Sequence, residues 1–236
     1  MRRLAEGVLQ LLYPKRCPMC DQILAKGEDY ICRGCSAQIR GVGKNYCMKC
    51  GKLLTEKERE YCADCLCHPH IFERGRSALV YEGKVKQSIY RFKYSGRKEY
   101  AEAYAYLVEK ELGDFIREVA PDVLIPVPLH RSRYCRRGYN QAELFARALG
   151  KRMGIRVETK LVKRVKNTLP QKNLALTQRQ NNLKKAFKLC RNDVKLNTTI
   201  IIDDIYTTGS TIDALAMQLK NAGVERIYFL TISGGK

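Results

Sequence analysis

The sequence contains no long apolar run and comparatively few acidic residues, and both shortages limit what the protein can be. No stretch of about 18 apolar residues occurs, so no transmembrane helix is expected. The apolar part of residues 1–12 is too short and interrupted for a signal peptide, so a cytoplasmic location is expected. Acidic residues number 24 against 44 Lys and Arg, a formal net charge of +20. This excess predicts a polyanionic partner such as nucleic acid, phosphorylated metabolites or diphosphate.

The glycine patterns of Walker loops and of dinucleotide-binding folds are also absent. The strongest phosphate-binding candidate is instead residues 200–211, where three isoleucines precede two aspartates and a Thr-Thr-Gly-Ser-Thr turn. The isoleucines predict a short buried strand that stops at the aspartates, and the apolar spacing beyond the turn predicts an amphipathic helix. Backbone N–H groups at that helix N-terminus favour an anion, and the carboxylates can accept hydrogen bonds from sugar hydroxyls. A phosphorylated ribose would satisfy both halves, whereas the competing interpretation is a strand–turn–helix with a solvated acidic pair.

Eight of the eleven cysteines form four CxxC pairs within residues 17–65. Shifting the first two pairs by thirty residues reproduces the other two, so this segment is an internal repeat. Paired thiols in a chain without an export signal bind metal, and four thiolates form a closed tetrahedral zinc site. Two structural zinc ions are therefore expected on Cys17, Cys20, Cys32, Cys35, Cys47, Cys50, Cys62 and Cys65. Pairs adjacent in sequence are expected to share an ion, and a crossed arrangement stays open. Cys67, His68 and His70 are interpreted as non-ligands, and the histidines as surface residues.

Strand and helix patterns alternate beyond residue 70, which predicts a parallel α/β sheet. The chain is therefore divided into an N-terminal amphipathic helix (1–16), a double zinc ribbon (17–70) and an α/β domain (71–236). Strands are expected at 77–81, 122–128, 200–202 and 226–233. Helices are expected at 84–94, 97–112 and 140–151, and after the turn of residues 207–211.

A cluster of basic residues follows the strand expected at 122–128. Four arginines fall within seven residues there, and the carboxyl ends of strands are where α/β sheets bind ligands. The fork geometry of guanidinium groups suits diphosphate, against the alternative of a solvated basic loop. The diphosphate-binding candidates are His130, Arg131, Arg133, Arg136 and Arg137.

Residues 151–195 carry fourteen Lys and Arg against two acidic residues, a local balance of +12. Residues 157–165 are expected to form an edge strand pair, whereas residues 166–188 are too polar for a core and are interpreted as a mobile flap. Such a flap would close over a phosphate ligand or lie along a nucleic-acid backbone. The candidate lid or nucleic-acid residues are Lys172, Arg179, Lys184, Lys185 and Lys188.

The Asp-Asp and Thr-Thr-Gly-Ser-Thr stretch resembles the PRPP-binding motif of type I phosphoribosyltransferases. The whole chain is similar to the ComF family, which is associated with natural competence; the cysteine module and residues 80–83, 127–131 and 137–143 carry the match together with that motif. The resemblance implies a parallel-sheet, type I phosphoribosyltransferase-like domain preceded by a small tandem zinc-ribbon module. It also implies PRPP with Mg²⁺ as ligand, and single-stranded DNA and a competence helicase as candidate partners. The implied PRPP-binding residues are Asp203, Asp204, Tyr206, Thr207, Thr208, Gly209, Ser210 and Thr211.

Two function classes remain from the sequence. The first is an enzyme that transfers ribose 5-phosphate from PRPP to an unidentified acceptor. The second is a nucleic-acid-binding protein that keeps the site for 5′-phosphorylated ends or for sensing PRPP. Salvage of 6-oxopurines is disfavoured, because those enzymes carry an acid/base aspartate where this chain has Thr207. The charge of residues 151–195 favours the nucleic-acid class.

Overall fold

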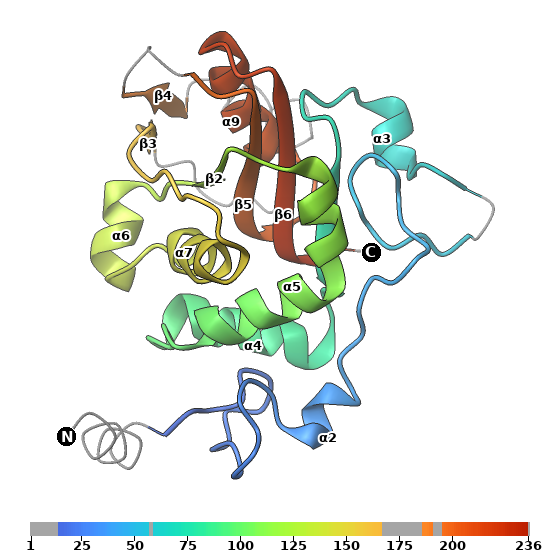
Figure 1. Ribbon diagram of the computed structural model, residues 1–236, viewed down its shortest axis with the longest axis vertical. Helices are drawn as coiled ribbons and strands as arrows, with labels where there is room; N and C mark the ends of the chain where they lie inside the picture. Colours follow the sequence, from blue (N-terminus) through green and yellow to red (C-terminus); the bar gives the residue numbers. More distant parts are fainter. Residues whose placement is uncertain (1–13, 57–58, 167–185, 191–194, 236) are drawn as a thin grey trace.

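Residues 14–56, 59–166, 186–190 and 195–235 are described by the computed structural model (Figure 1). Most of the amphipathic helix expected over residues 1–16 lies outside this part of the chain. The elements are α2 (Arg33–Ser36), α3 (Ala63–Cys67), β1 (Gly75–Val80), α4 (Gly83–Tyr94), α5 (Tyr100–Val119), β2 (Val123–Pro126), α6 (Arg131–Arg137), α7 (Gln141–Met153), β3 (Val162–Arg164), β4 (Phe187–Leu189), β5 (Thr198–Tyr206), α9 (Ser210–Asn221) and β6 (Arg226–Gly234). Their order confirms the mixed α/β class.

Four strands form one parallel sheet in the order β1-β6-β5-β2. Ile200 of β5 lies opposite Tyr228 of β6 on one side and Leu124 of β2 on the other. Continuous apolar runs of this kind are typical of parallel strands that are covered on both faces. The predicted parallel sheet is therefore confirmed.

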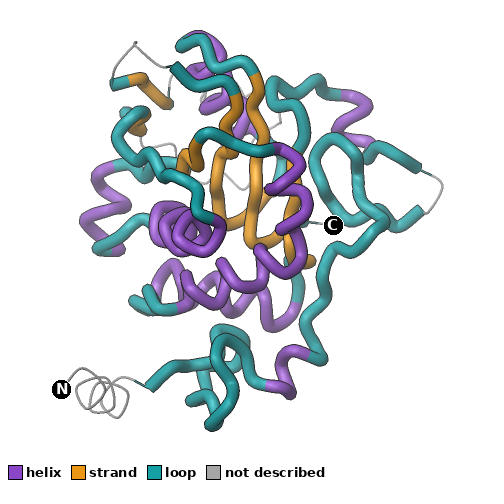
Figure 2. Tube along the Cα trace, viewed as in Figure 1, coloured by secondary structure: helices purple, strands orange, loops and turns teal. Residues whose placement is uncertain are grey.

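The side chains of β5 alternate between two hydrophobic cores, one on each face of the sheet. Ile200 and Ile202 pack in a core with residues of α4, α5 and α7, whereas Ile201 packs with residues of α9. The helices accordingly lie on both sides of the strands (Figures 1 and 2). None of the helices in the described ranges combines the length and the apolar character needed to span a bilayer.

Strand β5 is longer than the isoleucines predict. It continues through both aspartates to Tyr206, with Asp203 in register with Thr231 and Ile205 with Ser233. The prediction that the strand stops at the carboxylates is wrong, because β6 runs beside them and supplies hydrogen-bonding partners for the extra residues. The aspartates are consequently held on rigid sheet rather than in a turn.

One segment without a predicted element is helical, and one other local prediction is wrong. The arginine cluster after β2 forms the short helix α6, in which His130 is the N-cap and Gly138 the left-handed C-cap. The edge strand pair expected within residues 157–165 does not form as a unit. Its strand β3 pairs antiparallel with β4, and Val162 lies opposite Leu189 on the far side of residues 167–185. A pairing across that separation leaves no local signal in the sequence.

The two cysteine repeats pack on opposite faces of the sheet. Cys17 and Cys35 belong to the same core as α4 and α5, and Cys47 and Cys50 to the same core as α9. The connecting chain crosses the sheet edge, where Val42 N–H donates to the carbonyl of Ala78 in β1 at 3.0 Å. The blue and cyan segments in Figure 1 follow this path from below α4 to the side of β6. The metal-binding module is thus wrapped around the sheet edge.

Candidate functional site: two cysteine clusters and an acidic pair in a basic surround

Each cysteine repeat brings four sulfur atoms together. In both groups all Sγ atoms lie within 4.8 Å of one another. The groups are Cys17, Cys20, Cys32 and Cys35, and Cys47, Cys50, Cys62 and Cys65. Two cross-pair Sγ–Sγ distances are 3.8 Å (Cys20–Cys32) and 3.7 Å (Cys50–Cys62). A tetrahedral zinc ion with Zn–S bonds of about 2.3 Å requires sulfur atoms about 3.8 Å apart.

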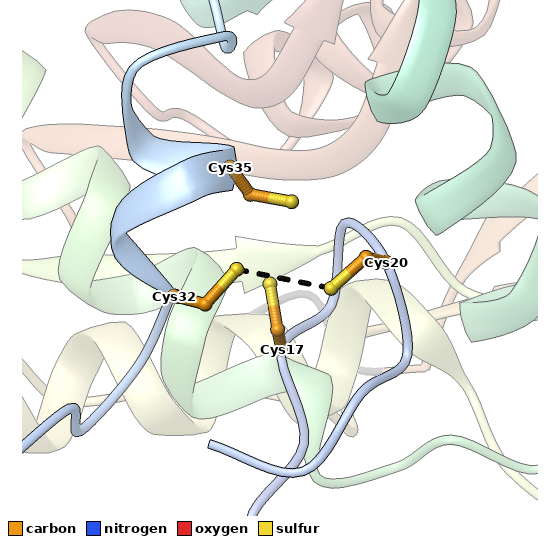
Figure 3. A group of neighbouring side chains, drawn as sticks. All are labelled: Cys17, Cys20, Cys32 and Cys35. Atoms are coloured by element: carbon orange, nitrogen blue, oxygen red, sulfur yellow. Dashed lines mark hydrogen bonds between the residues drawn. The ribbon is translucent and has the colours of Figure 1, made fainter. Parts of the chain in front are cut away.

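The clusters therefore fit zinc, and the side chains of the first group converge as such a site needs (Figure 3). Neighbouring CxxC pairs share each cluster, so the predicted pairing is confirmed and the crossed arrangement is excluded. Four thiolates fill a tetrahedral zinc site and leave no position for water or substrate. Both sites are structural.

The internal repeat is visible in the backbone as well. Residue 21 and its equivalent thirty residues later, Gly51, both have positive φ, 63° and 69°, directly after the first CxxC pair of each repeat. Asp21 in that conformation is fixed by hydrogen bonds from Arg97 and Tyr100, each 2.6 Å long. Burial alone would raise the pKa of Asp21, but these two bonds lower it. The first ribbon is thereby anchored to the chain around the start of α5.

The two aspartates of β5 meet a lysine that the sequence did not reveal. Lys93, near the end of α4, places Nζ 2.8 Å from Oδ1 of Asp204, and both side chains are largely buried. Asp203 Oδ1 accepts a hydrogen bond of 2.8 Å from the backbone N–H of Asp204. Burial, followed by the charge of Asp204, raises the pKa of Asp203 to about 7. The positive charge of Lys93 thus offsets part of the negative charge of the acidic pair, and both aspartates are shielded from solvent.

Three arginines complete a basic surround of the acidic pair. Arg137 of α6 donates to Gln141 Oε1 at 2.9 Å. It also lies close enough to Lys93 for its positive charge to oppose the protonation of that lysine. Burial lowers the pKa of Arg164 on β3, with Arg133 lowering it further and Asp203 raising it. Lys93, Arg133, Arg137 and Arg164 are called the basic cluster below. Charges of this sign around a strand end suit an anionic ligand.

The predicted diphosphate residues divide into two groups. Arg133 and Arg137 belong to the basic cluster, whereas Arg131 and Arg136 are exposed on α6. His130 uses Nδ1 to accept from the backbone N–H of Ser132 at 3.3 Å, which caps the helix. Arg164 was not predicted at all, since a single arginine in a short edge strand has no distinguishing pattern.

The turn after β5 leads directly into the N-terminus of α9. Gly209 has φ 78° and directly precedes α9, whose N-terminal N–H groups favour an anion. A Cβ at this position would lie 2.7 Å from Tyr206 Oη and 2.9 Å from His70 Cε1, so only glycine fits. Thr208 Oγ1 and Ser210 Oγ are 3.0 Å apart, and Thr207 is exposed. Glycine is therefore required at position 209 by close packing beneath the turn.

His70 is buried against this turn, and the interpretation of it as a surface residue is wrong. Its side chain is 4% exposed, and Nδ1 lies 2.7 Å from Oδ2 of Asp213 in the first turn of α9. The ring stacks on Phe72 with a centroid separation of 4.7 Å. The chain that leaves the second ribbon is thus attached to the start of α9. Neither cysteine cluster includes a histidine among the described residues.

Four of the five predicted flap residues, Lys172, Arg179, Lys184 and Lys185, lie outside the described residues. The fifth, Lys188, is exposed on β4 in register with Lys163. Their role as a lid or as nucleic-acid contacts stays a prediction.

The raised pKa of Asp203 makes stability depend on pH in a defined direction. The unfolded aspartate titrates near its ordinary pKa of about 3.9. Between that value and about 7 the folded protein holds a proton that the unfolded chain has released, so the free energy of unfolding falls as pH rises. Once both states are ionised, above about pH 8, this decline ends.

We expect urea unfolding of the zinc-loaded protein to reveal this decline between about pH 6 and 7. Asp203→Asn should remove this decline in the free energy of unfolding and leave the contributions of the other titrating groups unchanged. A variant as steep in its pH dependence as the parent protein would contradict the assignment.

Comparison with known proteins extends the resemblance over nearly the whole chain. A family model of the double zinc ribbon domain matches residues 8–66. Competence protein F of Haemophilus influenzae is 33% identical over 217 residues, which cover 90% of this chain and 93% of that protein. DNA utilization protein YhgH of Escherichia coli is 33% identical over 220 residues, covering 92% and 96%. Competence protein ComFC of Bacillus subtilis is 28% identical over 217 residues, covering 85% and 82%.

These matches span the cysteine clusters and the α/β sheet together, so they concern the whole architecture rather than one motif. The match to the double zinc ribbon model coincides with the two four-cysteine sites. The chain belongs to the ComF family of competence proteins.

Proposed function

We propose that the protein binds a 5′-phosphorylated ribose at the carboxyl end of β5 and handles single-stranded DNA during DNA uptake. The observation that carries this proposal is the meeting, at one strand end, of an acidic pair, a basic cluster and a glycine turn that opens α9. Membership of the ComF family supports a role in competence, and three relatives are named for competence or DNA utilization.

In this proposal Asp203 and Asp204 accept hydrogen bonds from the 2′- and 3′-hydroxyls of the ribose. The turn from Thr207 to Thr211 surrounds the 5′-phosphate with backbone N–H groups and hydroxyls. Arg133 and Arg137 meet the diphosphate when the ligand is PRPP, which would arrive with Mg²⁺. Lys93 holds Asp204 in place between binding events, because its Nζ lies 2.8 Å from Oδ1 of Asp204 and both side chains are largely buried.

One observation favours the alternative class, a Mg²⁺-dependent transferase that moves ribose 5-phosphate from PRPP to an unidentified acceptor. The pKa of Asp203 is raised to about 7, and a carboxyl group that titrates near neutral pH is suited to proton transfer. Release of diphosphate from PRPP in the presence of candidate acceptors would distinguish this enzyme from a binding protein.

A salt titration separates a DNA-binding flap from a lid. Replacing Lys184, Lys185 and Lys188 with glutamine should flatten the dependence of log K on log salt by roughly two units, because each phosphate contact on a single strand contributes about 0.7. Fluorescence anisotropy of a labelled oligonucleotide between about 50 and 200 mM salt measures this slope.

A charge-matched control for the same titration replaces three exposed lysines outside residues 151–195, Lys26, Lys44 and Lys110. If the control triple variant flattens the slope equally, the effect comes from net charge alone. If the flap variant instead spares DNA and weakens PRPP, the segment is a lid.

A further inference from the structure

Three tyrosines of α4 and α6 are exposed. Tyr90 is 63% exposed, Tyr94 51% and Tyr134 49%. Tyr90 and Tyr94 are four residues apart on α4, and their ring centroids are 4.8 Å apart. Lys86 is exposed one turn earlier on the same helix. Large aromatic rings left in solvent as a group mark a surface that binds something.

Arg137 connects this aromatic surface to the basic cluster. Its guanidinium lies 4.8 Å from the ring centroid of Tyr94 and donates a hydrogen bond of 3.1 Å to the Tyr94 hydroxyl. The end of α4 therefore lies beside α6, as Figure 1 also shows. Lys93, the residue before Tyr94, is the lysine that pairs with Asp204. Tyr94 thus lies beside Arg137, a member of the basic cluster.

The charge of α4 and α6 indicates which kind of molecule binds to the surface that carries the tyrosines. Together α4 and α6 contain eight Lys and Arg and no acidic residue. Lys93 and Arg91 are bonded within the protein, to Asp204 and to the carbonyls of Pro18 and Met19. An apolar protein partner would have to desolvate the exposed cations Lys86, Arg131 and Arg136, whereas a nucleic acid supplies phosphates for them. Proteins that bind single strands combine a basic groove with aromatic rings on which bases stack. Phe187, the aromatic residue of the flap, is buried and cannot stack on a base.

We propose that Tyr90, Tyr94 and Tyr134 form a base-stacking platform for single-stranded DNA, with the phosphates bound by the arginines of α6. This inference rests on the proposed function and specifies where the strand lies. A single DNA strand stacked on the platform reaches the acidic pair past Arg137, so its 5′-phosphorylated end can enter the ribose-phosphate site. The platform reads no particular sequence, because every base has a face that can stack.

The test replaces Tyr90 and Tyr94 together, once with alanine and once with phenylalanine, in the full-length zinc-loaded protein. Alanine removes the stacking surface, so the affinity for an oligothymidylate should fall about tenfold or more. Phenylalanine keeps the rings and should stay within about twofold. Stacking releases no counterions, so the salt slope should not change in either variant. Tyr61→Ala, which removes an exposed ring from the second ribbon, should bind as the parent protein does.

Photocrosslinking gives an independent readout. An oligonucleotide with 5-iododeoxyuridine should crosslink to peptides that contain Tyr90, Tyr94 or Tyr134, identified by mass spectrometry. Alanine variants that bind DNA normally would overturn the platform while the proposed DNA binding stands. If the parent protein itself binds no single-stranded DNA, both fail. Equal loss of PRPP and DNA binding in the alanine variant would also overturn the platform, since it indicates collapse of the neighbouring site.

Discussion

Replacing Cys50 with serine is expected to release the second zinc ion, unfold its ribbon and weaken the ribose-phosphate site. Structural zinc contributes about 10–16 kcal/mol of apparent binding free energy in zinc-finger peptides, far more than a ribbon of this size gains from its core. Cys50 packs in the same core as Phe72 and Tyr206, and Tyr206 directly precedes the turn that leads into α9. The unfolded ribbon would also release His70 from Asp213.

Two further cysteine variants make this prediction specific. Cys20→Ser disrupts the first cluster, on the opposite face of the sheet, and should lower zinc content from two ions to one with a smaller effect on PRPP. Cys67→Ser removes an exposed thiol outside both clusters and should keep both ions. Zinc is measured by elemental analysis and PRPP affinity by calorimetry. One zinc or none in the parent protein would refute the two-site model.

The double variant Asp203→Asn, Asp204→Asn is expected to weaken PRPP binding at least tenfold. A hydrogen bond to a charged group contributes about 1.5–3 kcal/mol, and this variant removes the acceptors proposed for both sugar hydroxyls. Because Asp203 is fully ionised only above its pKa of about 7, the titration is made at about pH 8. It also leaves Lys93 without its carboxylate partner, so stability should fall as well. Calorimetric titration with PRPP and Mg²⁺ should therefore be made well below the unfolding temperature of the variant.

A control matched in charge replaces Asp29 and Asp114, both exposed, with asparagine. This pair changes the net charge equally but lies outside the candidate site, so PRPP affinity should stay within about twofold. Unchanged affinity in the Asp203/Asp204 variant would refute the ribose-phosphate site. Loss in both variants would attribute the effect to the overall charge.

Much of the fold could be predicted from the spacing of residues along the chain. The thirty-residue repeat of CxxC pairs predicts the two zinc clusters, because a tight turn and a short helix bring each pair together without help from distant residues. The strand–turn–helix of residues 198–221 was predicted for the same reason. The exact end of β5 was missed, since it depends on pairing with β6.

Residues that complete the candidate site were missed where they come from distant segments. Lys93, Arg164 and His70 are ordinary members of a helix, a short strand and a linker when read in sequence. Lys93 becomes part of the site through its ion pair with Asp204, and Arg164 is positioned by the pairing of β3 with β4. The exposure of the tyrosines on α4 was also not predictable from the sequence. A helix with aromatic residues on both faces gives no periodic signal for the face that stays in solvent.

The amino-acid sequence by itself determined the zinc ligands, the parallel α/β class and the acidic–glycine motif, because each leaves a pattern along the chain: the spacing of the CxxC pairs, the alternation of strand and helix periodicity, and the run of residues 200–211. Only the tertiary structure decided that the two ribbons lie on opposite faces of the sheet and that a basic cluster surrounds the acidic pair. His70 and Asp213 are separated by 143 residues, and only the packing of the second ribbon against α9 brings them to 2.7 Å. Such contacts follow from how buried surfaces fit together, which no local pattern encodes.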